Sequence, residues 1–300
     1  MGLKLSEGGL QQNGRLIPCR EEEGIFDALG LAFIPTELRE NGGEIEAGET
    51  RRLLSLIEDQ DIKGVFHVHS FYSDGTNSIK DIAETARRMG FSYIGLSDHS
   101  QSACYAGGRT LEKLKKQWEE IDWINEESDG FHIFRGTESD ILPDGSLDYE
   151  EAILKQFDFV IASVHSHFNM PLEEMTQRVI KAVRNPYTTV LGHPTGRPLL
   201  AREPYAVDMI RIIDEASKTG VVIELNAHPF RLDIDWRLCK YAKEKGVKIA
   251  INPDAHNEEG LKDTYFGVGI GRKRWLEPQD ILNTMELEEI KDPLKKRRPS

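Results

Sequence analysis

Cysteine is scarce in this sequence, which has three such residues among 300. Cys19, Cys104 and Cys239 are odd in number, lie far apart and form no CxxC pair. A disulfide-stapled secreted domain and a zinc ribbon both need paired, closely spaced cysteines. The pattern therefore excludes both classes and indicates isolated thiols in a reducing compartment.

Long apolar runs are absent as well. No stretch approaches the ~20 residues that a membrane-spanning helix needs, and the opening MGLKLSEGGLQQNG lacks the apolar core of a signal peptide. We therefore expect a soluble, cytoplasmic protein with no membrane partner.

Basic residues are fewer than acidic ones. The sequence has 38 Lys and Arg and 51 Asp and Glu, and its formal net charge is -13. Such a surface is unsuited to a long groove that neutralises many nucleic-acid phosphates. A phosphate can still bind locally where divalent ions concentrate positive charge in one pocket. The charge thus argues against an extended nucleic-acid groove and leaves a local phosphate site open.

The chain divides into a short N-terminal extension and one large domain. Residues 1–60 are polar and turn-rich, with helices expected at 21–30 and 49–60, and look too small for a core of their own. In residues 61–300, β-rich segments alternate with amphipathic helical segments, as in a parallel α/β fold. Seven strands fit a closed or nearly closed barrel. They are expected at VFHVHS, YIGLSD, FHIFRGTE, FDFVIASVH, TTVLGH, GVVIELN and VKIAINPD.

Histidines and acidic residues gather at or just beyond the C-terminal ends of these strands. The candidates are His67, His69, Asp98, His99, Glu138, His165, His193, Asn226, Asp254 and His256, of which the first two lie within their strand. In barrel enzymes the C-terminal ends of the strands meet on one face and carry the active site. We therefore expect these side chains to form a single site.

The chemistry of this set points to metal ions. His67 and His69 are separated by one residue in a strand, so both side chains project to the same face. Imidazole and carboxylate ligands suit Mn, Fe or Zn rather than Ca or Mg, and the absence of cysteine ligands excludes a closed structural zinc site. Two or three such ions lower the pKa of a bridging water and neutralise charge on a phosphoryl group. Phosphoester hydrolysis needs both effects.

Carbonyl chemistry is the competing hypothesis. Metal-dependent amidohydrolases also carry HxH on the first strand of a barrel, but commonly add a bridging lysine after a middle strand. The middle strands here end in Glu138 and His165, without such a lysine. The sequence therefore favours phosphoester over amide hydrolysis.

Several residues beyond the strand ends are candidates for substrate contacts. Arg197 and Arg231 can each hold a phosphate in bidentate fashion, although a solvated arginine explains each equally well. The other candidates are Asn226, His167, His228, Tyr72 and Arg109. For His167 and His228 a structural role is the stronger alternative.

Seven segments carry a resemblance to a known family: HVHSFYSDG, GLSDHS, RGTESDIL, ASVHSHFN, LGHPTGR, ELNAHP and INPDAH. They resemble the polymerase and histidinol phosphatase superfamily, called PHP, over about residues 61–300. Within it, the chain is most similar to the C-terminal PHP domain of bacterial and archaeal family X DNA polymerases. Residues 1–60 resemble the end of the polymerase core that precedes this domain.

The resemblance implies a distorted seven-stranded (β/α)7 TIM-like barrel with up to three divalent ions. It assigns His67, His69, Glu138 and Asp254 to one ion, Glu138 with His165 and His193 to a second, and Asp74, His99 and His256 to a third. His69, Glu138 and Asp254, with a metal-bridging water, would then be catalytic.

The resemblance also implies an activity in DNA repair. The family's PHP domains are associated with Mn-dependent 3′-5′ exonuclease, 3′-phosphatase and sometimes abasic-site endonuclease activity, with Zn or Fe as alternative metals. DNA 3′ ends would be the substrate and a polymerase core a candidate partner. Polymerisation by this chain alone is not expected, because no Asp-rich palm fits into the first 60 residues. Two alternatives stay open: a phosphatase of small esters such as histidinol phosphate, and a non-catalytic, metal-stabilised interaction module.

Overall fold

Seven parallel strands form the centre of the larger domain, in the order β4-β5-β6-β7-β8-β9-β10. The computed structural model describes residues 2–103, 106–108 and 110–295. The strands are β4 (Gly64–Val68), β5 (Tyr93–Leu96), β6 (His132–Asp140), β7 (Phe159–Ser163), β8 (Val190–Leu191), β9 (Val222–Asn226) and β10 (Ile249–Asn252). A parallel bridge between Val68 and Ala255 brings the first strand against the segment after the last. The prediction of a nearly closed seven-stranded α/β barrel is confirmed.

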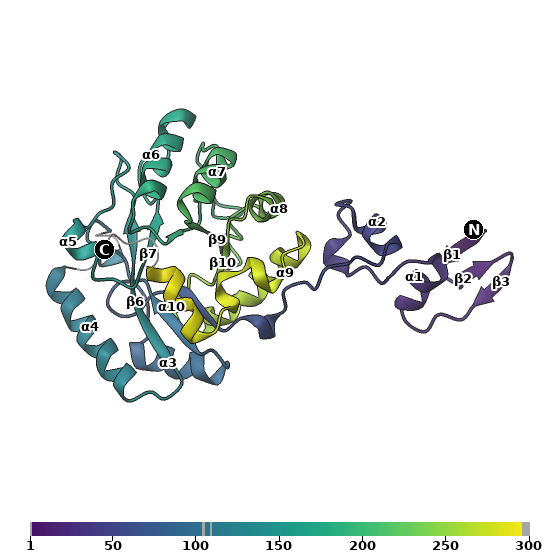
Figure 1. Ribbon diagram of the computed structural model, residues 1–300, viewed down its shortest axis with the longest axis horizontal. Coiled ribbons are helices and arrows are strands. Elements are labelled where there is room, and N and C mark those ends of the chain that lie inside the picture. Colours follow the sequence, from purple (N-terminus) through teal and green to yellow (C-terminus); the bar gives the residue numbers. More distant parts are fainter. Residues whose placement is uncertain (1, 104–105, 109, 296–300) are drawn as a thin grey trace.

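Helices connect the strands and cover the outside of the barrel (Figure 1). They are α3 (Ile79–Arg88), α4 (Leu111–Glu126), α5 (Glu151–Leu154), α6 (Leu172–Arg184), α7 (Met209–Thr219), α8 (Trp236–Glu244) and α9 (Thr264–Lys273), followed by α10 (Leu287–Lys295). The sequence of α3 shows why they form. The Ser78 side chain accepts the N–H of Asp81 at the start of this helix, and Ile79 and Ile82 lie on its buried side.

Apolar side chains from every strand fill the interior of the barrel. They are Phe66, Tyr93, Phe134, Phe159, Ile161, Val190, Val222 and Ala250. Ile290 and Leu294 of α10 pack on this cluster, and the Tyr93 hydroxyl donates to the carbonyl of Asn283. Tyr93, Val190 and Val222 are the first residues of their strands, so α10 closes the N-terminal end of the barrel. The opposite end is left for the polar side chains.

Glycine at position 136 is required by this packing. A Cβ added to Gly136 of β6 would overlap the ring of Phe159. We expect Gly136→Ala to lower the free energy of unfolding by about 1–3 kcal/mol, the usual cost of overpacking, as measured by urea denaturation. Gly269→Ala in α9 is the control, because nothing lies within 4 Å of the added methyl and alanine favours the helix. An equal loss in both variants would contradict the packing argument.

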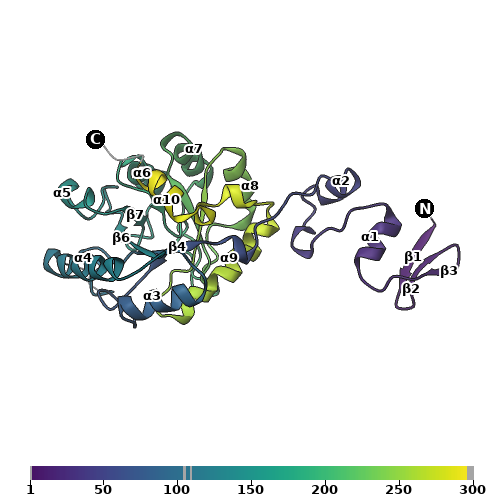
Figure 2. The ribbon, with the colours of Figure 1, turned by 60° about the horizontal axis from the view of Figure 1, so that its bottom comes forward.

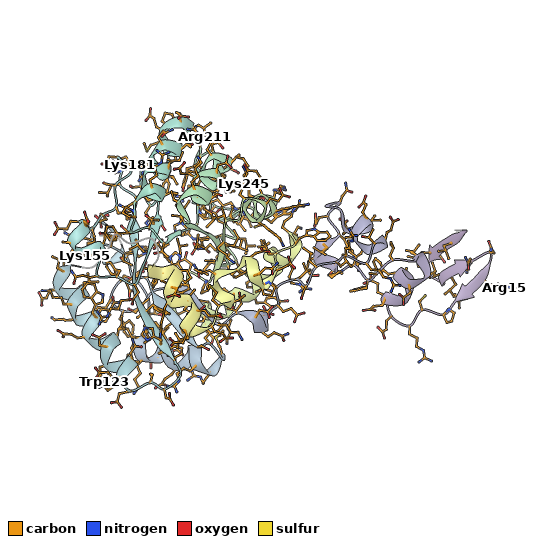
Figure 3. The ribbon with its side chains drawn as sticks, viewed as in Figure 1. Arg15, Trp123, Lys155, Lys181, Arg211 and Lys245 are labelled. Carbon is orange, nitrogen blue, oxygen red and sulfur yellow. The ribbon has the colours of Figure 1, made fainter. Side chains whose placement is uncertain are left out.

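Residues 2–50 form a lobe that extends away from the barrel (Figures 1 and 2). Its elements are β1 (Leu3–Ser6), β2 (Gly9–Gln12), β3 (Arg15–Ile17), α1 (Glu23–Leu29), the 3-10 turn η1 (Thr36–Leu38) and α2 (Glu44–Glu49). The small antiparallel sheet lies farthest from the barrel, with Arg15 at its tip (Figure 3). Ion pairs between Glu37 and Arg272, 2.7 Å apart, and between Glu40 and Lys273 attach the lobe to α9.

The prediction of a helix at residues 49–60 is wrong. The helix α2 ends at Glu49, Arg51 has a positive φ of 52°, and the chain then runs without helix to the 3-10 turn η2 (Asp59–Asp61). Leu56 and Ile57 are buried, and the N–H of Ile57 donates to the carbonyl of Leu276. Apolar side chains that look like one face of a helix are therefore used to seat an extended segment against the barrel.

The structure can be compared with the sequence on two further points, membrane-spanning helices and cysteines. No helix in the described ranges is long and apolar enough to cross a membrane. Cys19 and Cys239 are free thiols, and burial raises the pKa of Cys239 to about 12. Cys104 lies outside the described residues.

Candidate metal centre

His67 and His69 lie at the C-terminal end of β4, and both are fully buried. Their ring centroids are 5.2 Å apart, so the HxH spacing brings both rings to one side. The Nε2 atoms of both lie 3.4 Å from Oδ1 of Asp254, which follows β10. The first and last strands therefore meet at this carboxylate, at the point where the barrel closes.

Glu138 on β6 lies at the centre of the site and is 1% exposed. Its Oε1 is 3.4 Å from Nε2 of His67, 3.2 Å from Nε2 of His165 and 2.9 Å from Nε2 of His193. Its Oε2 is 3.0 Å from Nδ1 of His99. Burial alone would raise the pKa of Glu138, but the imidazoles around it hold that pKa well below its usual value. The carboxylate is therefore charged and joins imidazoles from four strand ends.

Asp74 forms the outer side of the site, on the loop after β4. Its Oδ2 lies 3.5 Å from Nε2 of His99 and 3.4 Å from Nε2 of His256, and its Oδ1 lies 3.5 Å from Nδ1 of His69. The rings of His69 and His256 stack with centroids 4.2 Å apart. The side chains of Asp74 and His256 are 33% and 38% exposed, so the site opens to solvent on this side.

These side chains form four groups whose ligand atoms lie within 4.8 Å of one another. The groups are His69, Asp74, His99 and His256; His67, His69 and Asp254; His67, Glu138 and His193; and His99, Glu138 and His165. The structure thus brings all the predicted metal ligands together. His165 and His193 both contact Glu138 but fall into different groups, so their common ion stays a prediction.

Unpaired ring nitrogens test whether a metal fits. The Nε2 of His67, both ring nitrogens of His69 and the Nδ1 of His193 are buried without a hydrogen-bond partner. Leaving a buried polar atom unpaired costs about 1–3 kcal/mol, and native structures rarely do so. Burial and the nearby His256 lower the pKa of His69 to about 4, which keeps it in the neutral form that coordinates metals. A nitrogen and oxygen set of this kind fits divalent Mn, Fe or Zn.

Two carboxylates that sequence reasoning missed hold the histidines from behind. Oε1 of Glu224, on β9, lies 2.7 Å from Nδ1 of His67, and its Oε2 accepts the backbone N–H of His193 at 2.6 Å. Oδ1 of Asp140 lies 2.6 Å from Nδ1 of His165. The contacts with Nδ1 of His67 and His165 orient these two rings so that Nε2 faces Glu138, as such carboxylates do at metal sites. A single acid inside the apolar strand VIELN was the signal for Glu224.

Asp98 supports the loop that carries Asp74 and is not one of the grouped ligands. Its carboxylate accepts the backbone N–H and the hydroxyl of Ser70 at 2.7 and 2.8 Å, and the hydroxyl of Ser73 at 2.6 Å. The side chain of Gln117, from α4, donates to the same carboxylate. Asp98 therefore holds the loop in which Asp74 follows Ser73.

The two arginines proposed for substrate contact differ in their surroundings. The Nε of Arg231 lies 3.1 Å from Oδ2 of Asp254, so this guanidinium reaches the metal-binding cluster. Arg197 donates to the carbonyls of Arg231 and Leu232 and lies 3.4 Å from Asp235. Arg197 therefore holds the loop after β9, whereas Arg231 contacts a predicted metal ligand.

The remaining candidates are spread around the site. Asn226 is buried and donates to Asp254 at 3.1 Å. His228 lines a pocket of about 330 Å³ together with Asp254 and His256. His167 is exposed at a positive φ of 57° on the loop after β7.

Tyr72, a candidate for lining a nucleotide pocket, contacts a neighbouring helix. The Tyr72 hydroxyl donates to Glu120 of α4 at 2.8 Å, and burial together with this carboxylate raises its pKa to about 12. This contact ties the loop after β4 to α4. Arg109 lies outside the described residues.

The barrel, the cluster at its C-terminal end and the family that the chain matches together define a metal-dependent phosphoesterase. The chain belongs to the PHP domain family, whose model matches residues 66–228, more than half of its length. A second model, the thumb of DNA polymerase beta, matches residues 1–40.

Named relatives agree with this class. The chain is 41% identical over 297 residues to a DNA polymerase/3′-5′ exonuclease PolX of Bacillus subtilis, which covers 98% of the chain and 52% of that protein. The chain thus spans about half the length of this relative. A probable phosphatase of Caldanaerobacter subterraneus is 31% identical, over 69% of the chain and 78% of that protein.

A solved structure shares the fold. It is a histidinol phosphate phosphatase of Lactococcus lactis, complexed with zinc, L-histidinol and phosphate. The TM-score is 0.51 at 17% identity, over 69% of this chain and 92% of that one. At this identity the likeness shows the barrel fold alone.

Proposed function

We propose that the chain hydrolyses phosphoester bonds at the 3′ ends of DNA in the cytoplasm, as a 3′-5′ exonuclease or 3′-phosphatase. The observation that carries this proposal is the likeness to the Bacillus polymerase/exonuclease over 98% of the chain. That likeness includes the N-terminal residues that the polymerase thumb model matches. In this proposal residues 1–60 are the end of a polymerase core, residues 61–300 are the hydrolytic domain, and the rest of such a core is the partner.

The metal-binding residues divide among up to three ions in this proposal. One set is His67, His69, Glu138 and Asp254, the second is Glu138, His165 and His193, and the third is Asp74, His99 and His256. When bound, such ions supply a water of lowered pKa and positive charge opposite the phosphoryl oxygens. Mn²⁺ is the activating ion that we propose, with Zn²⁺ or Fe²⁺ as alternatives, because the same ligands accept all three.

The protein's own side chains orient the reacting groups. Asn226 and Arg231 both contact Oδ2 of Asp254, so that Oδ1 faces His67 and His69. The free N–H groups of Arg231 then bind an oxygen of the phosphate, and fixed donors of this kind stabilise developing negative charge. His69, Glu138 and Asp254 are the residues on which we expect turnover to depend most.

The experiment that tests the proposal compares substrates and metals. The metal-stripped protein is mixed in turn with Mn²⁺, Zn²⁺, Fe²⁺ and Mg²⁺, and then with a single-stranded oligonucleotide, the same strand bearing a 3′-phosphate, and p-nitrophenyl phosphate. We expect nucleotides or phosphate to be released from the DNA, fastest with Mn²⁺, and no turnover without added metal. Silence on every substrate with every metal would leave the interaction module as the explanation of the cluster.

A phosphatase of small esters is the second candidate. Two observations favour it. The net charge of -13 weakens attraction for long DNA. Several relatives are named probable phosphatases, and the match to one of them covers 94% of that relative's length. Turnover of p-nitrophenyl phosphate together with inert oligonucleotides would support this candidate against DNA end processing.

A further inference from the structure

Two loops at the mouth of the metal centre are joined into one rim. The loop after β8 and the loop after β9 meet where the N–H of Leu199 donates to the carbonyl of Phe230 at 2.6 Å. The Arg197 side chain ties the same loops together through the carbonyls of Arg231 and Leu232. The rim is therefore held in place by several hydrogen bonds.

The rim presents apolar side chains to solvent. Phe230 is 66% exposed, and Leu200, the neighbour of Leu199, is fully exposed at 108%. Leu200 also has a positive φ of 62°, a backbone conformation that is uncommon for a bulky residue and that strains it. Strained backbone clusters at functional sites, so the rim is a candidate for contact with a ligand of the metal centre.

Phe230 lies beside the pocket at the metal centre. Its ring lies 5.6 Å from the ring of His228, and His228 lines the pocket of about 330 Å³ that Asp254 and His256 also line. The next residue, Arg231, contacts Asp254. The aromatic pair therefore leads from the wall of the pocket to the open surface, beside the side chain placed to meet a phosphate.

We propose that Phe230 and Leu200 form a base-binding ledge, on which an unpaired base of the DNA strand lies while the 3′-terminal phosphate is at the metal centre. This inference rests on the proposed function and names its substrate as a single-stranded 3′ end. An aromatic ring stacks on any base, so the contact tolerates every sequence. A small phosphate ester without a base gains nothing from the ledge.

The charge of the protein supports stacking as a source of affinity. With a net charge of -13, the surface as a whole repels the phosphates of a strand. The pocket wall beside His228 adds the carboxylates of Glu259 and Asp263. Uncharged contacts to bases do not suffer from this repulsion, and they place a strand without a basic groove.

The test uses Phe230→Ala and Leu200→Gly, two exposed positions at which the change leaves the core intact; glycine also relieves the positive φ of Leu200. The control is Trp123→Ala, because Trp123 is 57% exposed on α4, at the outer surface of the barrel (Figure 3). The substrates, with Mn²⁺, are a single-stranded oligonucleotide with a 3′-phosphate and β-glycerophosphate, an aliphatic ester with no ring to stack on Phe230. The quantity measured is the ratio of kcat/KM for the oligonucleotide to kcat/KM for the small ester.

We expect this ratio to fall about ten-fold in Phe230→Ala, within the range for the loss of one stacked base, and to fall in Leu200→Gly as well. Phe230→Trp should restore it, because tryptophan also stacks. A ratio within about two-fold of the unchanged protein in Phe230→Ala, or an equal fall in Trp123→Ala, would overturn the ledge while leaving the proposed function in place. An unchanged protein that turns over only the small ester would overturn both.

Discussion

The Asp254→Asn variant is expected to lose at least about 100- to 1,000-fold in kcat/KM on a 3′-phosphorylated oligonucleotide, the range measured when one group that stabilises a transition state is removed. Oδ1 of Asp254 is the atom that His67 and His69 share, at 3.4 Å from each. An amide has no charge with which to bind a cation. The measurement is initial rate against Mn²⁺ concentration, together with bound metal per chain.

Asparagine is a better replacement than alanine at this position. Asp254 has a φ of 53°, and asparagine adopts this left-handed conformation far more readily than alanine does. The loss of charge leaves Arg231 without its anionic partner, so some destabilisation is expected as well. The thermal unfolding temperature therefore has to be followed together with the rate.

The matched control for Asp254→Asn is Asp214→Asn on the outer face of the barrel. Asp214 contacts Tyr241 and Lys245 and lies on α7 (Figure 3 labels Lys245). Exposed ion pairs of this kind contribute about 0–1 kcal/mol, and we expect an unchanged rate. A rate for Asp254→Asn within ten-fold of the unchanged protein would remove Asp254 from the catalytic set.

The barrel was predictable because two periodicities agree over most of the chain. Strand segments such as VKIAIN and helical segments such as SIKDIAETARR alternate without a long interruption. Parallel strands and the helices that connect them have few arrangements other than such a fold in which both bury their apolar faces. The position of the ligands followed from the same pattern, since residues just after parallel strands converge on one face.

The failures lie where a residue depends on distant partners. Residues 49–60 have the composition of a helix, but contacts such as that of Ile57 with Leu276 select an extended path. Glu224 lies within a strand rather than beyond its end, so a search of strand ends passes over it.

The second large effect that we expect is a loss of metal affinity when Glu224 is replaced. Its pKa, which burial alone would raise, is held below its usual value chiefly by His67, so the carboxylate is charged. It fixes both Nδ1 of His67 and the backbone N–H of His193. In Glu224→Gln the amide can accept one of these contacts but not both, and the charge is lost. We expect about 10- to 100-fold weaker binding of Mn²⁺, the usual effect of losing such an outer partner.

Titration with Mn²⁺ separates this positioning role from a merely structural one. If Glu224 acts by orienting His67, the variant needs more Mn²⁺ for half-maximal rate, and excess Mn²⁺ recovers much of kcat. Glu173→Gln is the control, because Glu173 is an exposed residue of α6 that pairs with Arg211. A lowered unfolding temperature with an unchanged Mn²⁺ midpoint would instead show that Glu224 supports only the packing between β4 and β9. Rescue by metal is decisive because added Mn²⁺ compensates for a weakened ligand set but restores no hydrogen bond between the two strands.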